Sequence, residues 1–152
     1  MSISVIKISQ MPMGGNAKAG DELAGIRTGL NYQIDGQSTQ YSPLPSFMVT
    51  TLTQQMQPNT CYVANNAGLV TLTLPEIFEF GDIIEVIGYG AGGWQIAQNI
   101  SQQIFVGGIG TTSGVDGFIA SNQAMDSIIL KGIVPNTTLV NVGGPQGNLT
   151  WA

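Results

Sequence analysis

Three glycines, Gly88, Gly90 and Gly93, have the Gly-x-Gly-x-x-Gly spacing of a loop that binds nucleotides. In dinucleotide-binding proteins such a loop brings the backbone close to a pyrophosphate at the first turn of a helix. The segment after Gly93 lacks helical spacing, because Trp94 and Ile96 alternate with polar or small neighbours in the pattern of a half-buried strand. The sequence therefore favours a glycine turn between two antiparallel strands, and it predicts no nucleotide or other cofactor.

Acidic residues offer a second kind of chemistry, and one group of them lies close together in the sequence: Glu76, Glu79, Asp82 and Glu85. Two carboxylates at a suitable separation can hydrolyse a glycosidic bond. These four, however, fall on a turn and the strand that follows it, at spacings that suit a solvated edge. Asp116 lies in a glycine-rich loop and Asp126 follows the strand at 118–120, and neither has the dense Asp/Asn pattern of a calcium site. The sequence predicts no catalytic and no metal-binding residue.

The composition excludes several classes of function. The 152 residues include no His, a single Cys and only 4 Lys and Arg residues. Without His, neither a Ser-His-Asp centre nor an imidazole metal site can form within one chain. Cys61 lies in a strand-like segment, where a small buried side chain is the simpler interpretation. The few scattered basic residues offer no footprint for nucleic acid or an anionic membrane, and no apolar stretch approaches the length of a membrane span.

The balance of apolar and charged residues points to a surface that is covered by protein. Hydrophobic residues make up 43% of the chain, which is enough for a packed core. Charged residues make up only 9%, with a net charge of -5, so the surface has little protection against association. We therefore expect copies of the chain or other partners to cover part of it.

Short strand-like runs follow one another from residue 59 onward, separated by turns rich in Gly, Asn and Pro. This spacing predicts an all-β fold, either a sandwich or a barrel-like domain. In one run Leu72 and Leu74 alternate with Thr71 and Thr73, so at least one sheet has a polar face. The predicted strands cover residues 61–64, 69–74, 83–87, 94–97, 104–106, 118–120, 127–133, 138–142 and 149–151.

The chain divides into three parts that differ in residue pattern. Residues 1–35 contain strand-like runs at 3–8 and 30–35 and form a small N-terminal segment. Residues 36–58 form a connector with several prolines, in which Met48, Leu52 and Met56 have helix-compatible spacing although β-branched neighbours argue against a helix. Residues 59–152 form the β-rich domain.

Four segments of this domain, in order, resemble a β-rich module of bacteriophage tail fibre and related virion proteins: residues 59–75, 80–88, 90–99 and 135–140. The pieces at residues 8–12, 20–23 and 32–34 are similar to a short segment near the start of phage tail fibre proteins. The resemblance leaves residues 36–58 unmatched. It implies a homotrimeric virion protein of the phage tail, whose segment 1–35 binds the tail or baseplate and whose C-terminal head faces the host. The chain lacks the long shaft of most fibres, so a short fibre or a baseplate component is expected.

Aromatic side chains around the glycine turn are the predicted receptor contacts. Exposed rings stack on sugars, so Tyr89 in the turn and Trp94 directly after it are assigned to a host glycan or protein. For Trp94 the alternative is a place in the core or in an interface, and for Trp151 an oligomer interface is expected. The predicted function is non-catalytic host attachment. A structural baseplate or capsid-decorating protein is the alternative, and a polysaccharide depolymerase is the less favoured one.

Overall fold

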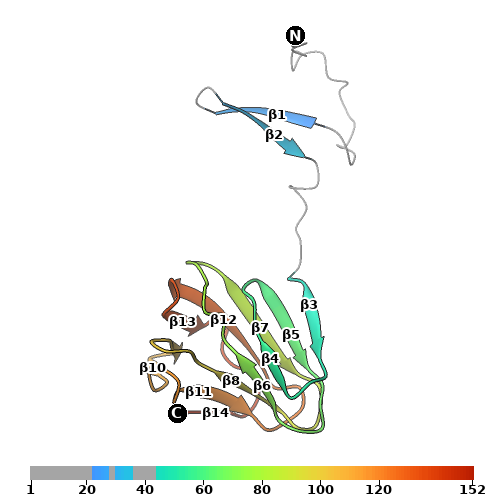
Figure 1. Cartoon of the computed structure of the whole chain (residues 1–152), viewed down its shortest axis with the longest axis vertical. Helices are drawn as coiled ribbons and strands as arrows, with labels where there is room; N and C mark the ends of the chain where they lie inside the picture. The colour runs from blue at the N-terminus through green and yellow to red at the C-terminus, as the bar shows by residue number, and fades with distance from the viewer. Residues whose placement is uncertain (1–21, 28–29, 36–43) are drawn as a thin grey trace. The chain divides into compact units, whose positions relative to one another are not determined.

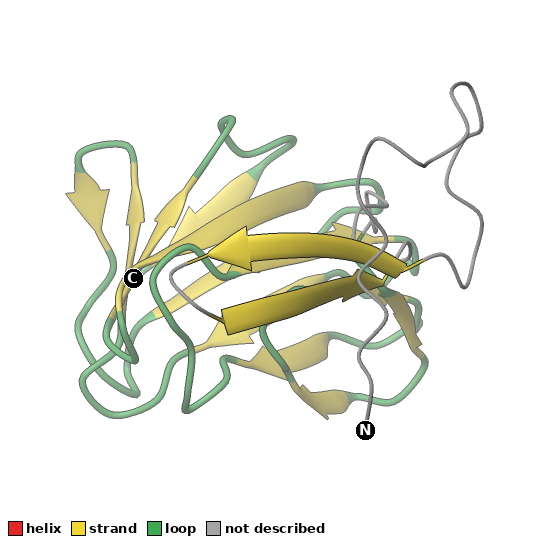
Figure 2. Cartoon of the chain, turned by 90° about the horizontal axis from the view of Figure 1, so that it is seen from above, coloured by secondary structure: helices red, strands yellow, loops and turns green. Residues whose placement is uncertain are grey.

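The computed structural model describes residues 22–27, 30–35 and 44–152, and the chain divides into two compact units, Met1–Ser42 and Pro43–Ala152. Within the described ranges the secondary structure consists of strands and loops without a helix (Figure 2). The predicted all-β class is confirmed.

The described part of the first unit is a β-hairpin. Strand β1 (Glu22–Arg27) pairs antiparallel with β2 (Leu30–Asp35), in a register that runs from Glu22 opposite Asp35 to Arg27 opposite Leu30. The strand predicted at residues 30–35 is confirmed. The run predicted at residues 3–8, with the rest of the segment up to residue 21, lies outside the described residues.

The second unit consists of two mixed sheets with a hydrophobic core between them (Figure 1). The seven-stranded sheet has the order β10-β9-β13-β12-β7-β5-β3 and contains β3 (Ser46–Val49), β5 (Thr60–Ala64), β7 (Ile83–Gly88), β9 (Gln103–Val106), β10 (Ile109–Gly110), β12 (Ser127–Val134) and β13 (Thr138–Asn141). The five-stranded sheet has the order β14-β11-β8-β6-β4 and contains β4 (Thr53–Gln55), β6 (Val70–Thr73), β8 (Trp94–Ala97), β11 (Phe118–Ser121) and β14 (Leu149–Trp151).

Strands β3 to β8 wind the chain alternately through the two sheets. In one sheet β3 pairs parallel with β5 and β5 with β7, while in the other β4 pairs parallel with β6 and β6 with β8. A strand of the seven-stranded sheet and the next strand along the chain, which lies in the five-stranded sheet, together form one coil. The coils β3–β4, β5–β6 and β7–β8 stack on one another. Strands β11 and β12 then add to β8 and β7 in the antiparallel direction.

This winding corrects the prediction for the glycine turn. Strands β7 and β8 belong to different sheets, so the loop between them is a corner and does not join two paired antiparallel strands. The reason is that β7 pairs with β5 and β12, and β8 pairs with β6 and β11, which leaves no free edge for a β7–β8 hairpin.

Alternating side chains fill the space between the sheets. Leu72 and Leu74 are fully buried while Thr71 and Thr73 face outward, so the predicted polar face is confirmed and belongs to the five-stranded sheet. Burial of each large apolar side chain contributes about 1.5–3 kcal/mol to folding. The largest buried side chains are Trp94, Phe78, Met56, Leu72, Leu74, Ile84, Ile96, Ile104, Ile119, Ile128, Leu130 and Leu139.

The boundary of the β-rich domain lies earlier than residue 59. Strands β3 and β4 fall within the predicted connector 36–58, yet they form the first coil, and Met56 is completely buried. The second unit accordingly begins at Pro43. Pairing of β3 with β5 and of β4 with β6 brings this segment into the two sheets. Val49 and Met56 are buried in the core, whereas Met48 and Leu52 are exposed.

The glycines of the β7–β8 corner allow direct contact between backbones. A Cβ atom on Gly90 would lie 2.3 Å from the backbone nitrogen of Asn66, and one on Gly92 would lie 2.1 Å from the carbonyl oxygen of Gly68. Gly93 has φ +70°, a left-handed conformation that favours glycine. The corner therefore rests on the preceding corner at residues 65–68 with no room for side chains.

We expect Gly92→Ala to lower the free energy of unfolding by about 1–3 kcal/mol or more, because backbone atoms cannot move aside as a flexible side chain would. Urea unfolding of both proteins measures the difference. Gly108→Ala is the matched control, since a Cβ there would meet nothing within 4 Å. Equal losses in the two variants would contradict the stacking explanation.

Candidate binding site at the corner loops

Four loops gather at one end of the sandwich. Strands β3, β5 and β7 are parallel, so the loops that follow them, at residues 50–52, 65–69 and 89–93, lie at the same end. The loop at 122–126 joins them, because Met125 N donates to Gly88 O at 2.6 Å and Gly88 N donates to Asp126 O at 2.9 Å. We call these four segments the corner loops. Since β3 runs toward them, the chain enters the sandwich at the opposite end.

Hydrogen bonds fix the corner loops to one another. The Asn66 side chain donates from Nδ2 to Thr50 O at 2.6 Å and accepts at Oδ1 from Gly68 N at 2.8 Å. Gly92 N donates to Asn66 O at 3.1 Å. Asn66 thus ties together three successive corners. A surface built on such loops is preorganised, so the loops would lose little conformational entropy when a ligand binds.

The corner loops present apolar and aromatic side chains without exposed charge. Tyr89 is 56% exposed, and the other large exposed side chains are Leu52, Leu69 and Met125. The one charged residue of these loops, Asp126, is buried, and its carboxylate accepts a hydrogen bond from the Ser121 hydroxyl.

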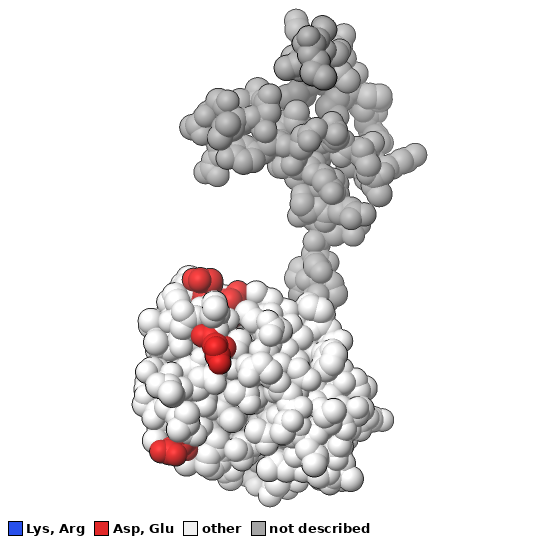
Figure 3. Space-filling model, in the orientation of Figure 1, with Lys and Arg blue, Asp and Glu red and all other residues white. Residues whose placement is uncertain are grey.

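The exposed acids lie elsewhere on the sandwich. Glu76, Glu79 and Asp82 belong to the β6–β7 connection, and Asp116 lies in the loop that leads into β11. Both connections lie at the end away from the corner loops, because β7 and β11 run toward those loops. Figure 3 shows a few separate acidic patches and no basic side chain on an otherwise uncharged face.

The structure places the two aromatic residues predicted as receptor contacts in different environments. Tyr89 lies on the surface, as expected for a turn, and its contact with a receptor stays a prediction. Trp94 is 0% exposed, and its Nε1 donates to Asp126 O at 3.1 Å. A receptor contact by Trp94 is therefore excluded in this structure. The alternative prediction, a place in the core, is the one that fits. Trp94 faces inward because it is in register with buried Val70 and Ser121.

The four clustered acids do not converge on one site. Glu85 points outward from β7, next to Cys61 of β5. Asp82 is already bonded, since its Oδ1 accepts from Asn59 Nδ2 at 2.7 Å and its Oδ2 accepts from Glu79 N at 2.8 Å. Asp82 thus stabilises the β6–β7 connection.

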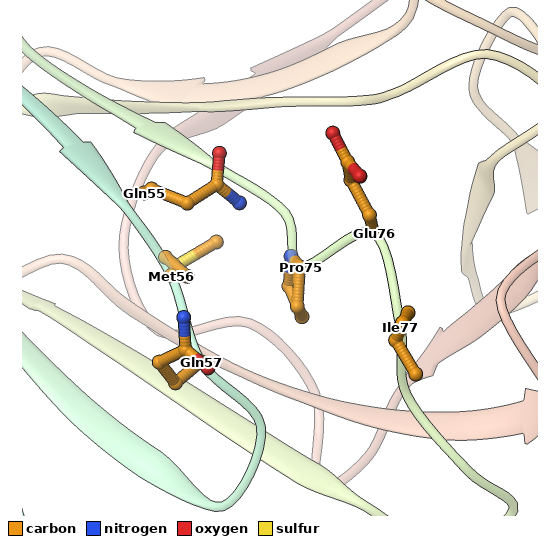
Figure 4. A pocket seen from close by; sticks show the side chains of 6 residues that line it. All are labelled: Gln55, Met56, Gln57, Pro75, Glu76 and Ile77. Carbon is orange, nitrogen blue, oxygen red and sulfur yellow. The ribbon is translucent and has the colours of Figure 1, made fainter.

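Two open hollows border Glu76. The first lies between the end of β4 and the β6–β7 connection and is lined by Gln55, Met56, Gln57, Pro75, Glu76 and Ile77 (Figure 4). The Gln55 amide there donates to Leu74 O at 2.8 Å. The second hollow contains Asn99, Ser101, Asn136 and Thr137 beside Glu76. Glu76 is the only carboxylate that lines either hollow, so neither one offers the pair of acids that glycoside hydrolysis requires.

The described residues contain no group of three or more His, Cys, Asp or Glu side chains that could hold a metal ion. The Gly88–Gly93 loop leads into strand β8, so it lacks the helix N-terminus that would bind a pyrophosphate. The geometry of the corner loops suits noncovalent recognition of an uncharged ligand surface.

Cys61 is a buried free thiol on the outer side of the seven-stranded sheet, in register with Ser46 and Glu85. Burial raises the pKa of the Cys61 thiol to about 11, the negative charge of Glu85 adds to the rise, and the Ser46 hydroxyl opposes it. The thiol is thus held in its neutral, unreactive form.

No protein-family model and no curated protein matches the chain. In the part of the chain that the structure describes, there is no helix that could span a membrane.

We expect Cys61 to react slowly with iodoacetamide near pH 9 in the folded protein and rapidly in urea. Because the folded pKa is raised from 9.0 to about 11, the neutral thiol stabilises the fold fully below pH 9.0, and this contribution is lost as the pH rises through 11. Mass spectrometry of the alkylated protein measures the rate. The double variant Cys61→Ser with Thr73→Cys, which has an outward-facing thiol, is the control. Equal rates for folded and denatured Cys61 would refute the expectation.

Trp94→Ala should lower the free energy of unfolding by about 3–5 kcal/mol, because it leaves a cavity in the core. Trp151→Ala is the matched control, since Trp151 is 38% exposed on the edge strand β14 and should cost far less. Thermal or urea unfolding measures both, and a larger loss for the Trp151 variant would contradict the burial pattern.

Proposed function

We propose that this chain is a non-catalytic phage tail fibre protein that attaches to a glycan or protein of the host surface through the corner loops. The observation that supports it best is the position of Tyr89. This exposed aromatic side chain lies on hydrogen-bonded loops at the end of the sandwich opposite the point where the chain enters. The likeness of residues 59–75, 80–88, 90–99 and 135–140 to a β-rich tail fibre module supports the same function.

The path of the chain suits a fibre tip. In this proposal the N-terminal unit binds the tail or baseplate, the sandwich begins with β3 at Ser46, and the corner loops are free to face the host. The protein would then be located in the virion, at the phage tail, as a homotrimer. The very small number of charged residues is in keeping with a subunit that is partly covered by its copies.

The chemistry of the corner loops suits an uncharged ligand. The Tyr89 ring offers a face on which a sugar ring can stack. Asn122 and Gln123 are exposed on the neighbouring loop, and their amides can donate to and accept from sugar hydroxyls. No exposed charge stands beside them, so a neutral glycan would meet no electrostatic penalty.

A structural role in the baseplate or on the capsid is the second candidate. The exposed apolar side chains of Leu52, Leu69 and Met125 favour it, since apolar groups gathered on one end suit contact with another protein. A tail or capsid protein that binds the corner loops, with no binding to host cells, would establish this role in place of attachment.

We expect the purified protein to bind host cells or their surface polysaccharide, and Tyr89→Ala to weaken that binding by about tenfold or more, as loss of an aromatic hot spot does. Phe80→Ala is the matched control, because Phe80 is an aromatic residue 72% exposed at the other end of the sandwich. Binding to cells by fluorescence, together with thermal unfolding to verify folding, gives the comparison. Equal effects of the two substitutions would refute a site at the corner loops.

A further inference from the structure

Large apolar side chains gather on the outer face of the seven-stranded sheet. In β7, Ile84 and Val86 point into the core, so Ile83, Glu85 and Ile87 point outward. The same alternation turns apolar side chains outward on the neighbouring strands, together with the polar side chains of Ser46, Ser127 and Lys131. We call this surface the apolar sheet face and define it by Met48, Val63, Ile83, Ile87, Ile129 and Val140.

These side chains share one face of the sheet, with a few polar side chains among them. The strand register places Met48 beside Val63 and Val63 beside Ile87. On the other side of β7, Lys131 lies between Ile83 and Val140, and Ile129 lies beside Glu85. From β3 to β13 the face spans five adjacent strands, or about 19 Å at the usual strand spacing of about 4.8 Å.

The outer face of the five-stranded sheet has the opposite character. Its outward side chains include Thr71 and Thr73 of β6 and Gln95 of β8. A sheet face in water normally carries polar side chains of this kind. The two outer faces of one sandwich therefore differ, and the more apolar one is the better suited to contact with protein.

The charges on the apolar sheet face balance each other. Lys131 is the only basic residue in the second unit, and it points outward from β12. Glu85 lies on the adjacent strand two register positions away. A second copy of the same face would thus meet one base and one acid, whereas the connections at the chain-entry end carry acids alone and would repel their copies.

We propose that copies of this chain associate through the apolar sheet face. The face is self-complementary in charge, because Lys131 of one copy can approach Glu85 of another, and it buries apolar side chains that a single chain leaves half-exposed. The proposal supplies the contact surface for the homotrimer proposed above and rests on that assembly. The corner loops and the polar face of the five-stranded sheet remain free.

The test is the mass of the full chain in solution. Light scattering at micromolar concentration should show an oligomer for the wild-type chain and a folded monomer for Ile129→Lys, which puts a second positive charge beside Lys131 on the face. Gln95→Lys is the matched control, since it introduces the same residue in the middle of β8 on the polar face, and it should leave the oligomer intact. Circular dichroism of each variant verifies folding.

An Ile129→Lys oligomer of wild-type mass would overturn the assignment of the face and leave the assembly itself standing. A monomeric wild-type chain would overturn self-association, while binding to host cells would still test the attachment function separately. If Ile129→Lys fails to fold, a short bis-maleimide cross-linker decides instead. Cross-linking between copies in Cys61→Ser with Ile129→Cys, and none in Cys61→Ser with Gln95→Cys, supports the proposal, and the reverse result refutes it.

Discussion

Contact between the backbones of successive corners is the constraint on which the sandwich depends. Parallel strands in each sheet must lie about 4.8 Å apart, and the corners that join the sheets must rise by the same amount. Gly90 and Gly92 meet that requirement, since a Cβ on either would strike the backbone of the corner below. Asn66 then bonds both to the corner above it and to the corner below it. A bulkier corner would separate the coils and weaken the ladder in both sheets at once.

This constraint also decides which parts of the chain can meet a partner. Winding through two sheets brings all the corners to one end and the long acidic connections to the other. It gives each sheet one inner and one outer face, and the outer faces differ in composition. The few charged residues are therefore distributed unevenly over the second unit. The corner loops at one end expose no charge, one sheet has an apolar outer face, and the other sheet has a polar outer face.

Tyr89 and Trp94 show how closely surface and core lie in such a corner. The two residues flank the same glycines, yet one ring is exposed and the other fills the core beneath the corner loops. Trp94 donates to Asp126 O, and Asp126 accepts from Gly88 N and from Ser121. The buried tryptophan thus supports the loops that present the exposed tyrosine, so both residues serve the candidate site although only one can touch a ligand.

The sequence by itself determined where most strands lie, because alternation and turn residues are local properties. It placed β8 at residues 94–97, set Leu72 and Leu74 against Thr71 and Thr73, and put Tyr89 on a turn. It did not reveal that β3 and β4 belong to the sandwich or that β5 and β7 run parallel, and it left Trp94 open between a receptor contact and a place in the core or in an interface. Those features depend on which strand pairs with which, as in the register of Cys61 with Glu85. Strand pairing joins residues far apart in the chain, and only the tertiary structure decides it.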